Sequence, residues 1–143
     1  MATELGELSD FIDGGGLAFT FNGERFEVDP SAQTVLKFQK TYRELMDKNE
    51  LDGENMLRLG AELLGGTLDG RNMQFKGGVA SKLIDAGASF EQVNRVIMTA
   101  ITKYWLNDDA ASEYYRTGDM GKALSARANR GKGSTAPDAT QTA

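Results

Sequence analysis

Few side chains in this sequence are suited to chemistry, and the most reactive types are missing. Histidine and cysteine are absent from the 143 residues, which excludes disulfides and removes the commonest general base and the usual zinc ligands. Carboxylates remain: Asp108 and Asp109 precede Glu113 by about one helical turn, a spacing that could hold a hard cation. A calcium loop needs acids at alternate positions over about twelve residues. We therefore expect these aspartates to cap a helix.

Glycine-rich stretches are a second candidate, because such loops can hold phosphate groups. Gly121-Lys122 lacks the following Ser or Thr that would bind magnesium, and Gly118 lies too close to it for a phosphate loop. No strand pattern precedes this pair or Gly131-Lys132. The glycines at 14–16 lead into a strand and not into a lysine. The sequence thus predicts linkers here, and we assign no catalytic residue, cofactor or metal site and expect no enzyme.

Aromatic side chains are the third candidate, and they indicate binding rather than reaction. Tyr104, Trp105, Tyr114 and Tyr115 cluster at the predicted junction of two helices. Tyrosine and tryptophan are enriched at the centres of protein interfaces, but they also fill small cores. The pattern favours the core for Trp105 and leaves Tyr115 open between core and interface. At the edges of this helix pair, Met98, Tyr104 and Tyr115 are the candidate partner-binding residues.

A long amphipathic helix that begins at Ser89 must position these aromatic residues. Ser89 with Gln92 fits a capping box, which marks the start of a helix. Apolar side chains then recur at helical spacing, at Val93, Val96, Ile97, Ala100, Ile101, Tyr104 and Trp105. A short helix over residues 79–86, closed by Gly87, comes before it. Another, from Asp109 to about Arg116 with Asp108 as its cap, follows.

A β-hairpin over residues 17–28 is the clearest strand signal. Asn22-Gly23 is the preferred two-residue type I′ turn. The turn pairs Phe21 with Glu24, Phe19 with Phe26 and Leu17 with Val28, which places the apolar side chains of both strands on one face. An isolated hairpin is marginally stable in water. We therefore expect this face to pack on helices or on another chain.

The remaining segments complete an α+β, mainly α fold: an N-terminal β-hairpin followed by about five short-to-medium helices and a disordered C-terminal tail. One helix opens with Asp29 as N-cap and Pro30 as its first residue, and a second covers about residues 53–64. Residues 67–78 read as a loop anchored by Met73 and Phe75. Residues 1–16 are a short helix (Leu5, Leu8, Phe11, Ile12) with a glycine linker, residues 17–116 the hairpin and helical domain, and residues 117–143 a flexible, low-complexity basic tail.

Charge divides the chain into an acidic body and a basic tail. The net charge is −5, with 16 basic and 21 acidic residues. Residues 116–143 hold 5 and 2 of these, so residues 1–115 hold 11 and 19. An acidic body argues against nucleic-acid binding; the tail could contact RNA or an acidic partner, although a solvated tail is favoured. No apolar run could cross a bilayer, and the acidic N-terminus is unlike a signal peptide, so we expect a cytoplasmic protein.

Several runs resemble one protein family, the small tail assembly chaperones of long-tailed (siphovirus-type) phages that infect actinobacteria. The similarity covers about residues 17–116, and the general plan of hairpin, Pro-Ser-Ala at 30–32, helices and low-complexity tail is similar too. The runs that carry it lie at residues 63–65 (Leu-Leu-Gly), 83–93 (beginning Leu-Ile-Asp-Ala-Gly), 100–105 (Ala-Ile-Thr-Lys-Tyr-Trp) and 107–115 (beginning Asn-Asp-Asp-Ala-Ala).

The resemblance implies a role in viral tail assembly rather than catalysis. Members of the family act in the host cytoplasm, bind the tape measure protein and help tail tube protein assemble around it. They are absent from the mature virion, and a longer form usually arises by programmed frameshift near the end of the reading frame. A homo-oligomer is compatible with the sequence. The alternatives are a structural virion component (head–tail connector or tail subunit), a carboxylate enzyme and a regulator of a host factor.

Overall fold

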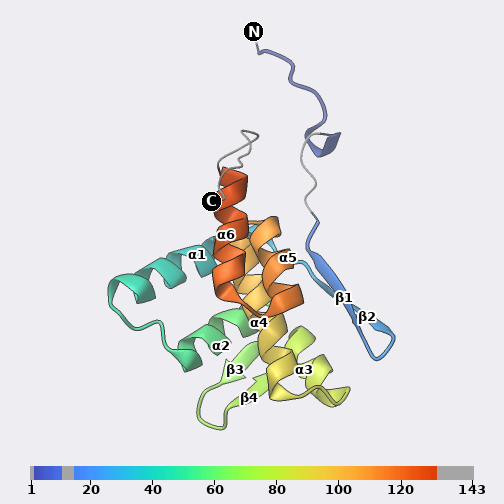
Figure 1. Cartoon of the computed structure of the whole chain (residues 1–143), viewed down its shortest axis with the longest axis vertical. Helices are drawn as coiled ribbons and strands as arrows, with labels where there is room; N and C mark the ends of the chain where they lie inside the picture. The colour runs from blue at the N-terminus through green and yellow to red at the C-terminus, as the bar shows by residue number, and fades with distance from the viewer. Residues whose placement is uncertain (1, 11–14, 132–143) are drawn as a thin grey trace.

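A central helix, α4, organises an α+β fold that is mainly helical, as the sequence predicts (Figure 1). The computed structural model describes residues 2–10 and 15–131. Four other helices contact α4 (Phe90–Trp105): α1 (Ala32–Asp47), α2 (Gly53–Leu63), α3 (Gly78–Asp85) and α5 (Asp108–Thr117). The hydrophobic core therefore surrounds one helix instead of filling a space between two layers.

The α4 helix begins and packs as its sequence predicts. The Ser89 hydroxyl accepts a hydrogen bond from the Gln92 backbone N–H (3.2 Å), and the Gln92 side chain accepts one from the Ser89 N–H (2.8 Å). Two buried threonines, Thr99 and Thr102, each donate to the carbonyl four residues earlier at 2.6 Å. Because these hydroxyls are satisfied within the helix, α4 can be buried on several sides without unpaired polar groups.

The hairpin consists of β1 (Leu17–Phe21) and β2 (Glu24–Val28), and its predicted register is confirmed in all three pairs. Asn22 and Gly23 both have positive φ angles (51° and 82°), as a type I′ turn requires. The two strands differ in burial on the shared apolar face. Phe26 and Val28 of β2 are buried, whereas the apolar side chains of β1 are only half-buried. The hairpin is thus anchored mainly by β2.

The α2 and α4 helices cross at a point where one of them has no side chain. A Cβ atom added to Gly60 of α2 would lie 2.1 Å from Cγ2 of Ile97, which is fully buried in α4. Carbon atoms in contact are normally about 3.5–4.0 Å apart. Glycine at position 60 therefore sets how closely the two helices approach.

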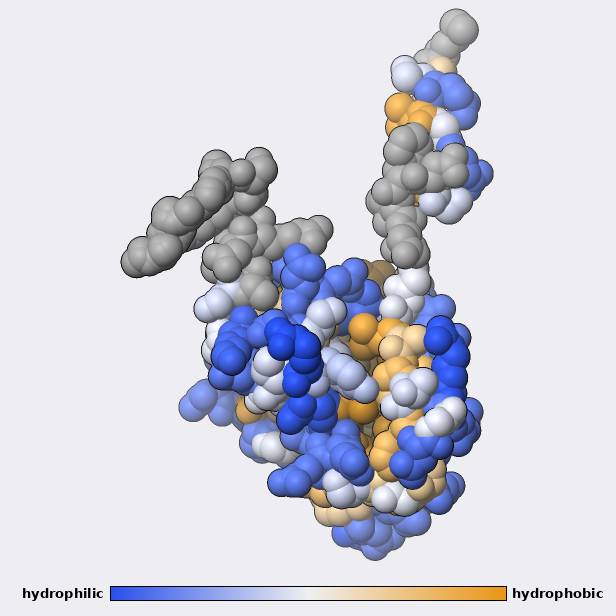
Figure 2. Space-filling view, turned by 45° about the vertical axis from the view of Figure 1, so that its right-hand side comes forward, coloured by the Kyte–Doolittle hydropathy of each residue, from blue (hydrophilic) through white to orange (hydrophobic). Residues whose placement is uncertain are grey.

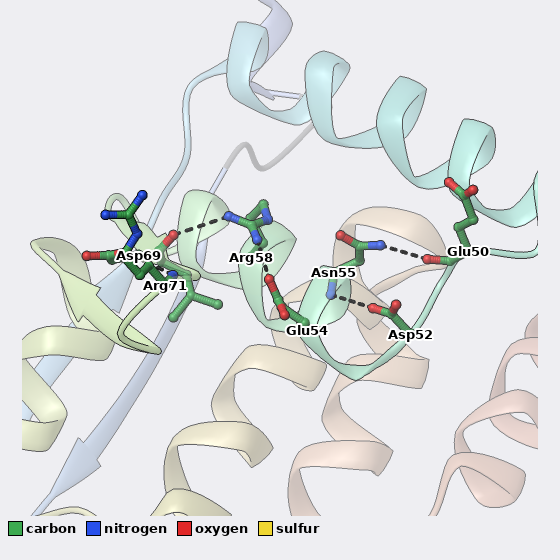
Figure 3. Close-up of polar contacts among 8 residues, drawn as sticks. Glu50, Asp52, Glu54, Asn55, Arg58, Asp69 and Arg71 are labelled. Carbon is green, nitrogen blue, oxygen red and sulfur yellow. Dashed lines mark hydrogen bonds and ion pairs between the residues drawn. The ribbon is translucent and has the colours of Figure 1, made fainter.

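Polar contacts fix the start of α2 and tie its middle to the segment that follows it (Figure 3). Asp52 caps the helix by accepting from the Asn55 N–H (2.9 Å), and the Asn55 side chain donates to the Glu50 carbonyl (2.8 Å). One turn later, the Arg58 guanidinium pairs with Glu54 (2.6 Å) and donates to the Leu68 carbonyl (3.3 Å). Arg58 thus ties α2 to the segment that follows it.

That segment is a second small hairpin, so the loop predicted for residues 67–78 is wrong in part. Strands β3 (Thr67–Asp69) and β4 (Gln74–Lys76) pair antiparallel. Hydrogen bonds in the turn lower the pKa of Asp69, and the one from the Arg71 backbone N–H has the largest effect. Phe75 is half-buried and packs against the core, but Met73 is exposed and does not act as an anchor. Strands of three residues are too short to produce a recognisable alternating pattern.

Two predicted helix caps are displaced by one or two residues. Ser31, and not Asp29, caps α1 by accepting from the Thr34 N–H at 3.2 Å. Asn107, and not Asp108, caps α5 by accepting from the Ala110 N–H at 2.8 Å. Asn, Asp and Ser cap helices about equally well. Adjacent candidates of these types leave the first residue of a helix undetermined by sequence.

The two ends of the chain depart from the predicted organisation. A sixth helix, α6 (Met120–Gly131), packs on α5 with Ala123 fully buried, so the predicted flexible tail does not begin at residue 117. Residues 132–143 lie outside the described residues. At the N-terminus a short 3-10 helix, η1 (Leu8–Asp10), stands in place of the predicted helix. Phe11 and Ile12, part of that prediction, also lie outside the described residues.

Replacing Gly60 with alanine should destabilise the protein, because the new methyl group would overlap Ile97. Overpacking a core costs typically about 1–3 kcal/mol, and an overlap this close should exceed the gain of about 1 kcal/mol in helix propensity. Urea unfolding monitored by circular dichroism would measure the difference in the free energy of unfolding.

Gly53→Ala is the matched control for this substitution. Gly53 is the first residue of the same helix, and an added Cβ would have no neighbour within 4 Å. We expect Gly53→Ala to leave the free energy of unfolding unchanged or raise it by up to about 1 kcal/mol. Equal effects of the two substitutions would contradict the importance of the α2–α4 crossing.

Ser89→Ala should lower the free energy of unfolding by about 1 kcal/mol, since it removes the acceptor for the Gln92 N–H at the start of α4. The same urea titration would measure this change. Ser112→Ala, an exposed serine inside α5, serves as the control and should change stability by less than about 0.5 kcal/mol. A loss at Ser112 as large as that at Ser89 would argue against the capping box as its cause.

Candidate protein-binding groove

The acidic cluster considered from the sequence is accounted for by structural contacts. Asp108 pairs with Lys103, and Glu113 pairs with Arg116. Across the described part of the chain, no group of three or more Asp, Glu, His or Cys side chains is placed to bind a metal ion. None of the helices in residues 2–10 and 15–131 is long and apolar enough to cross a bilayer.

An apolar groove lies between strand β1 and helices α4 and α5. In the space-filling view, hydrophobic side chains line a hollow beside the hairpin (Figure 2). Its volume is about 510 Å³. We call it the hairpin groove, and its lining residues are Leu17, Ala18, Phe19, Val28, Val96, Thr99, Ala111, Ser112, Tyr115 and Arg116. Arg116 is the one charged residue among them, and it is paired with Glu113, so the lining of the groove is mainly apolar.

A second hollow of about 460 Å³ adjoins the hairpin groove. Phe19, Val96 and Tyr115 line both spaces and separate them. The Phe19 and Tyr115 rings lie 6.2 Å apart with a tilt of 45°, and Phe19 stacks on Phe26 at 5.4 Å. Tyr115 remains 40% exposed. Phe26 supports the pair from the protein side, and the exposed face of Tyr115 is open to solvent. Such an aromatic pair is suited to contact apolar side chains.

Arg95 of α4 positions the end of α5 beside this aromatic pair. Its guanidinium donates to the Tyr115 carbonyl (3.0 Å) and lies over the Tyr114 ring, 5.9 Å from its centre. A positive charge near the last carbonyls of a helix is favourable. Gly118 ends α5 with a φ of 69°, and an added Cβ there would lie 2.4 Å from the Arg95 guanidinium. This arrangement holds Tyr115 at the groove.

The three residues predicted to bind a partner do not form one site. Tyr115 lines the hairpin groove. Met98 lines a separate hollow of about 260 Å³ between α1, α4 and α6, together with Trp105 and Leu124. Tyr104 lines neither space: its backbone carbonyl accepts from Gln39 at 2.9 Å, and burial raises the pKa of its half-buried hydroxyl. Trp105 packs against the core with its ring 4.4 Å from that of Tyr42.

Phe19 and Arg116 line the groove and Arg95 lines the adjoining hollow, but none of the three was singled out from the sequence as a binding residue. Phe19 was expected on the apolar face of the hairpin, and the sequence left open whether that face would pack or stay free. In the structure, the apolar side chains of β2 are buried in the core, whereas those of β1 are half-buried and border the groove. The arginines carry no local signal, since their role depends on contacts between separate elements.

Comparisons with known proteins give a family for the chain but no activity. No curated protein and no solved structure matches it. One family model, described as a domain of unknown function (DUF7426), matches residues 6–143. The match spans the hairpin, all of the described helices and the groove between them. The chain therefore belongs to the DUF7426 family.

Proposed function

We propose that this protein is a phage tail assembly chaperone, which binds its client by protein–protein contact and carries out no catalysis. The hairpin groove is the observation that carries the proposal: an apolar hollow beside a half-exposed aromatic pair. The sequence resemblance to tail assembly chaperones of actinobacterial phages supplies the identity of the client. That client is the tape measure protein, and tail tube protein is the second partner.

The shape and chemistry of the groove suit a helical client. An amphipathic helix binds a hydrophobic groove through apolar side chains spaced three or four residues apart. The tape measure proteins of such phages are long and largely helical, so they present this pattern many times. A groove of this kind shields apolar side chains of the client that would otherwise cause aggregation.

The charge of the protein supports the same role. A net charge of −5 keeps a small protein soluble when it carries an open apolar groove. We place this activity in the host cytoplasm, where tails are assembled.

Tyr115→Glu should weaken binding of the tape measure protein by about tenfold or more, because a buried interface tyrosine is commonly worth about 2 kcal/mol. Co-expression of both proteins, followed by measurement of the soluble fraction of the tape measure protein and of the affinity, would test this. Leu36→Glu is the matched control, because Leu36 is also an exposed apolar residue but lies on α1 (61% exposed). Equal loss in both variants would exclude the groove as the client site.

The runner-up function is a structural virion component, such as a head–tail connector or a tail subunit. A chaperone leaves after assembly, whereas a structural component stays in many copies per particle. Quantitative mass spectrometry of purified particles should therefore find the tail tube protein in abundance and this protein at trace level or not at all. A stoichiometric amount of it in particles would favour the structural role.

A further inference from the structure

Strand β1 has a free edge at the outside of the fold. The hairpin lies at one side of the helical body, and β2 is the one strand of the described chain that pairs with β1 (Figure 1). A type I′ turn is closed by a hydrogen bond between Phe21 and Glu24, and hydrogen-bonded pairs then alternate along an antiparallel ladder. Ala18 and Thr20 therefore direct their backbone N–H and C=O groups away from β2. Both residues are exposed, and no other backbone group in the described chain pairs with them.

This edge lacks the features by which proteins keep strand edges from pairing. Charged side chains, proline and bulges are the common ones. Strand β1 has none of them, since its sequence is Leu-Ala-Phe-Thr-Phe and its register with β2 is continuous. The other described strands all carry charges: β2 has Glu24, Arg25 and Glu27, β3 has Asp69 and β4 has Lys76. The edge of β1 is thus suited to accept a further strand.

The sequence of β1 is complementary to itself in one antiparallel register. In that register a two-fold axis passes between Phe19 of one copy and Phe19 of the other. Ala18 then lies opposite Thr20 of the second copy, and these residues exchange the backbone hydrogen bonds that each edge has free. Within each hairpin Phe19 already stacks on its register partner Phe26, with ring centres 5.4 Å apart and planes 9° from parallel. The pairing extends this stack into a row of four phenylalanines across four strands.

A second β1 also places an apolar side chain at each hollow beside the hairpin. Leu17 and Phe19 line the hairpin groove, whereas Phe19 and Phe21 line the adjoining hollow. In the two-fold register, Phe21 of the second copy lies opposite Leu17, and Leu17 of the second copy lies opposite Phe21. Alternate residues of the added strand therefore match the two hollows on either side of Phe19.

The exposed face of the hairpin favours the antiparallel arrangement by charge. Within one hairpin, Ala18 pairs with Glu27 and Thr20 pairs with Arg25. The two-fold register gives each exposed row across the four strands a Glu27 at one end and an Arg25 at the other. In-register parallel pairing would instead give rows with two glutamates or two arginines, which is less favourable.

We propose that two copies of this chain pair through their β1 edges and form one four-stranded antiparallel sheet, in the order β2-β1-β1-β2. Each copy covers the hairpin groove of the other with its own apolar side chains. The dimer and a client-bound chain therefore exclude each other. That exclusion rests on the proposed function, whereas the dimer does not.

Sedimentation equilibrium of the full chain tests the pairing. The average mass should rise with concentration from one chain toward two and stop there, because a two-fold interface uses both β1 edges and closes. A mass of one chain up to millimolar concentration would overturn the proposal and leave the edge to a strand of another protein. Growth beyond two chains would also overturn it, because it requires an interface that does not close.

Charged substitutions on the exposed face of β1 test the register. Ala18→Glu combined with Thr20→Glu places like charges directly opposite each other in both rows, which is destabilising. The matched control, Ala18→Lys combined with Thr20→Glu, places opposite charges in the same rows and also faces Glu27 and Arg25 with opposite charges. We expect the dissociation constant of the first variant to be about tenfold or more above that of the control. Equal dissociation constants, or loss of the dimer in the control, would overturn the register.

A mixing experiment distinguishes loss of pairing from loss of folding. Ala18→Lys combined with Thr20→Lys should weaken the dimer as the doubly acidic variant does. An equal mixture of the doubly basic and doubly acidic variants should restore it, because each strand then meets a partner of opposite charge. A mixture that sediments as single chains would overturn the proposal. No sample contains a client, so this outcome is distinct from failure of the chaperone function.

Discussion

The close crossing of α2 and α4 at Gly60 is the constraint on which the rest of the fold depends. Ile97 fills the space that a side chain at position 60 would need, and it is fully buried. Helices α1, α2, α3 and α5 all contact α4. The hairpin and α5 border the groove together with α4. The groove lies where those two elements meet without closing completely.

Local signals were sufficient for much of this fold, because they depend on neighbouring residues. The Asn22-Gly23 turn determined the hairpin register, and Ser89 with Gln92 marked the start of α4. The second hairpin and α6 escaped prediction for physical reasons. Strands of three residues carry no periodicity, and α6 is rich in small and polar residues. Ala123 is its buried residue among positions 120–125.

The hairpin groove was less accessible to sequence reasoning, because its lining residues come from four separate elements. Tyr115 was identified from its residue type and its place at a helix junction. Its partners Phe19 and Arg95 are distant in sequence, and nothing local indicates that they meet it. Met98 and Tyr104 have suitable residue types, but α4 turns them toward other surroundings. Residue type predicts which side chains could line a groove, whereas tertiary packing decides which of them do.

The unequal burial of the two hairpin strands has a consequence for how this family can diversify. Phe26 and Val28 of β2 belong to the core, so substitutions there lower the free energy of unfolding. Leu17 and Phe19 of β1 border the groove and are only half-buried. Substitutions in β1 can therefore change the lining of the groove while the core is preserved. A two-residue turn separates a strand whose side chains complete the core from a strand whose side chains shape the groove.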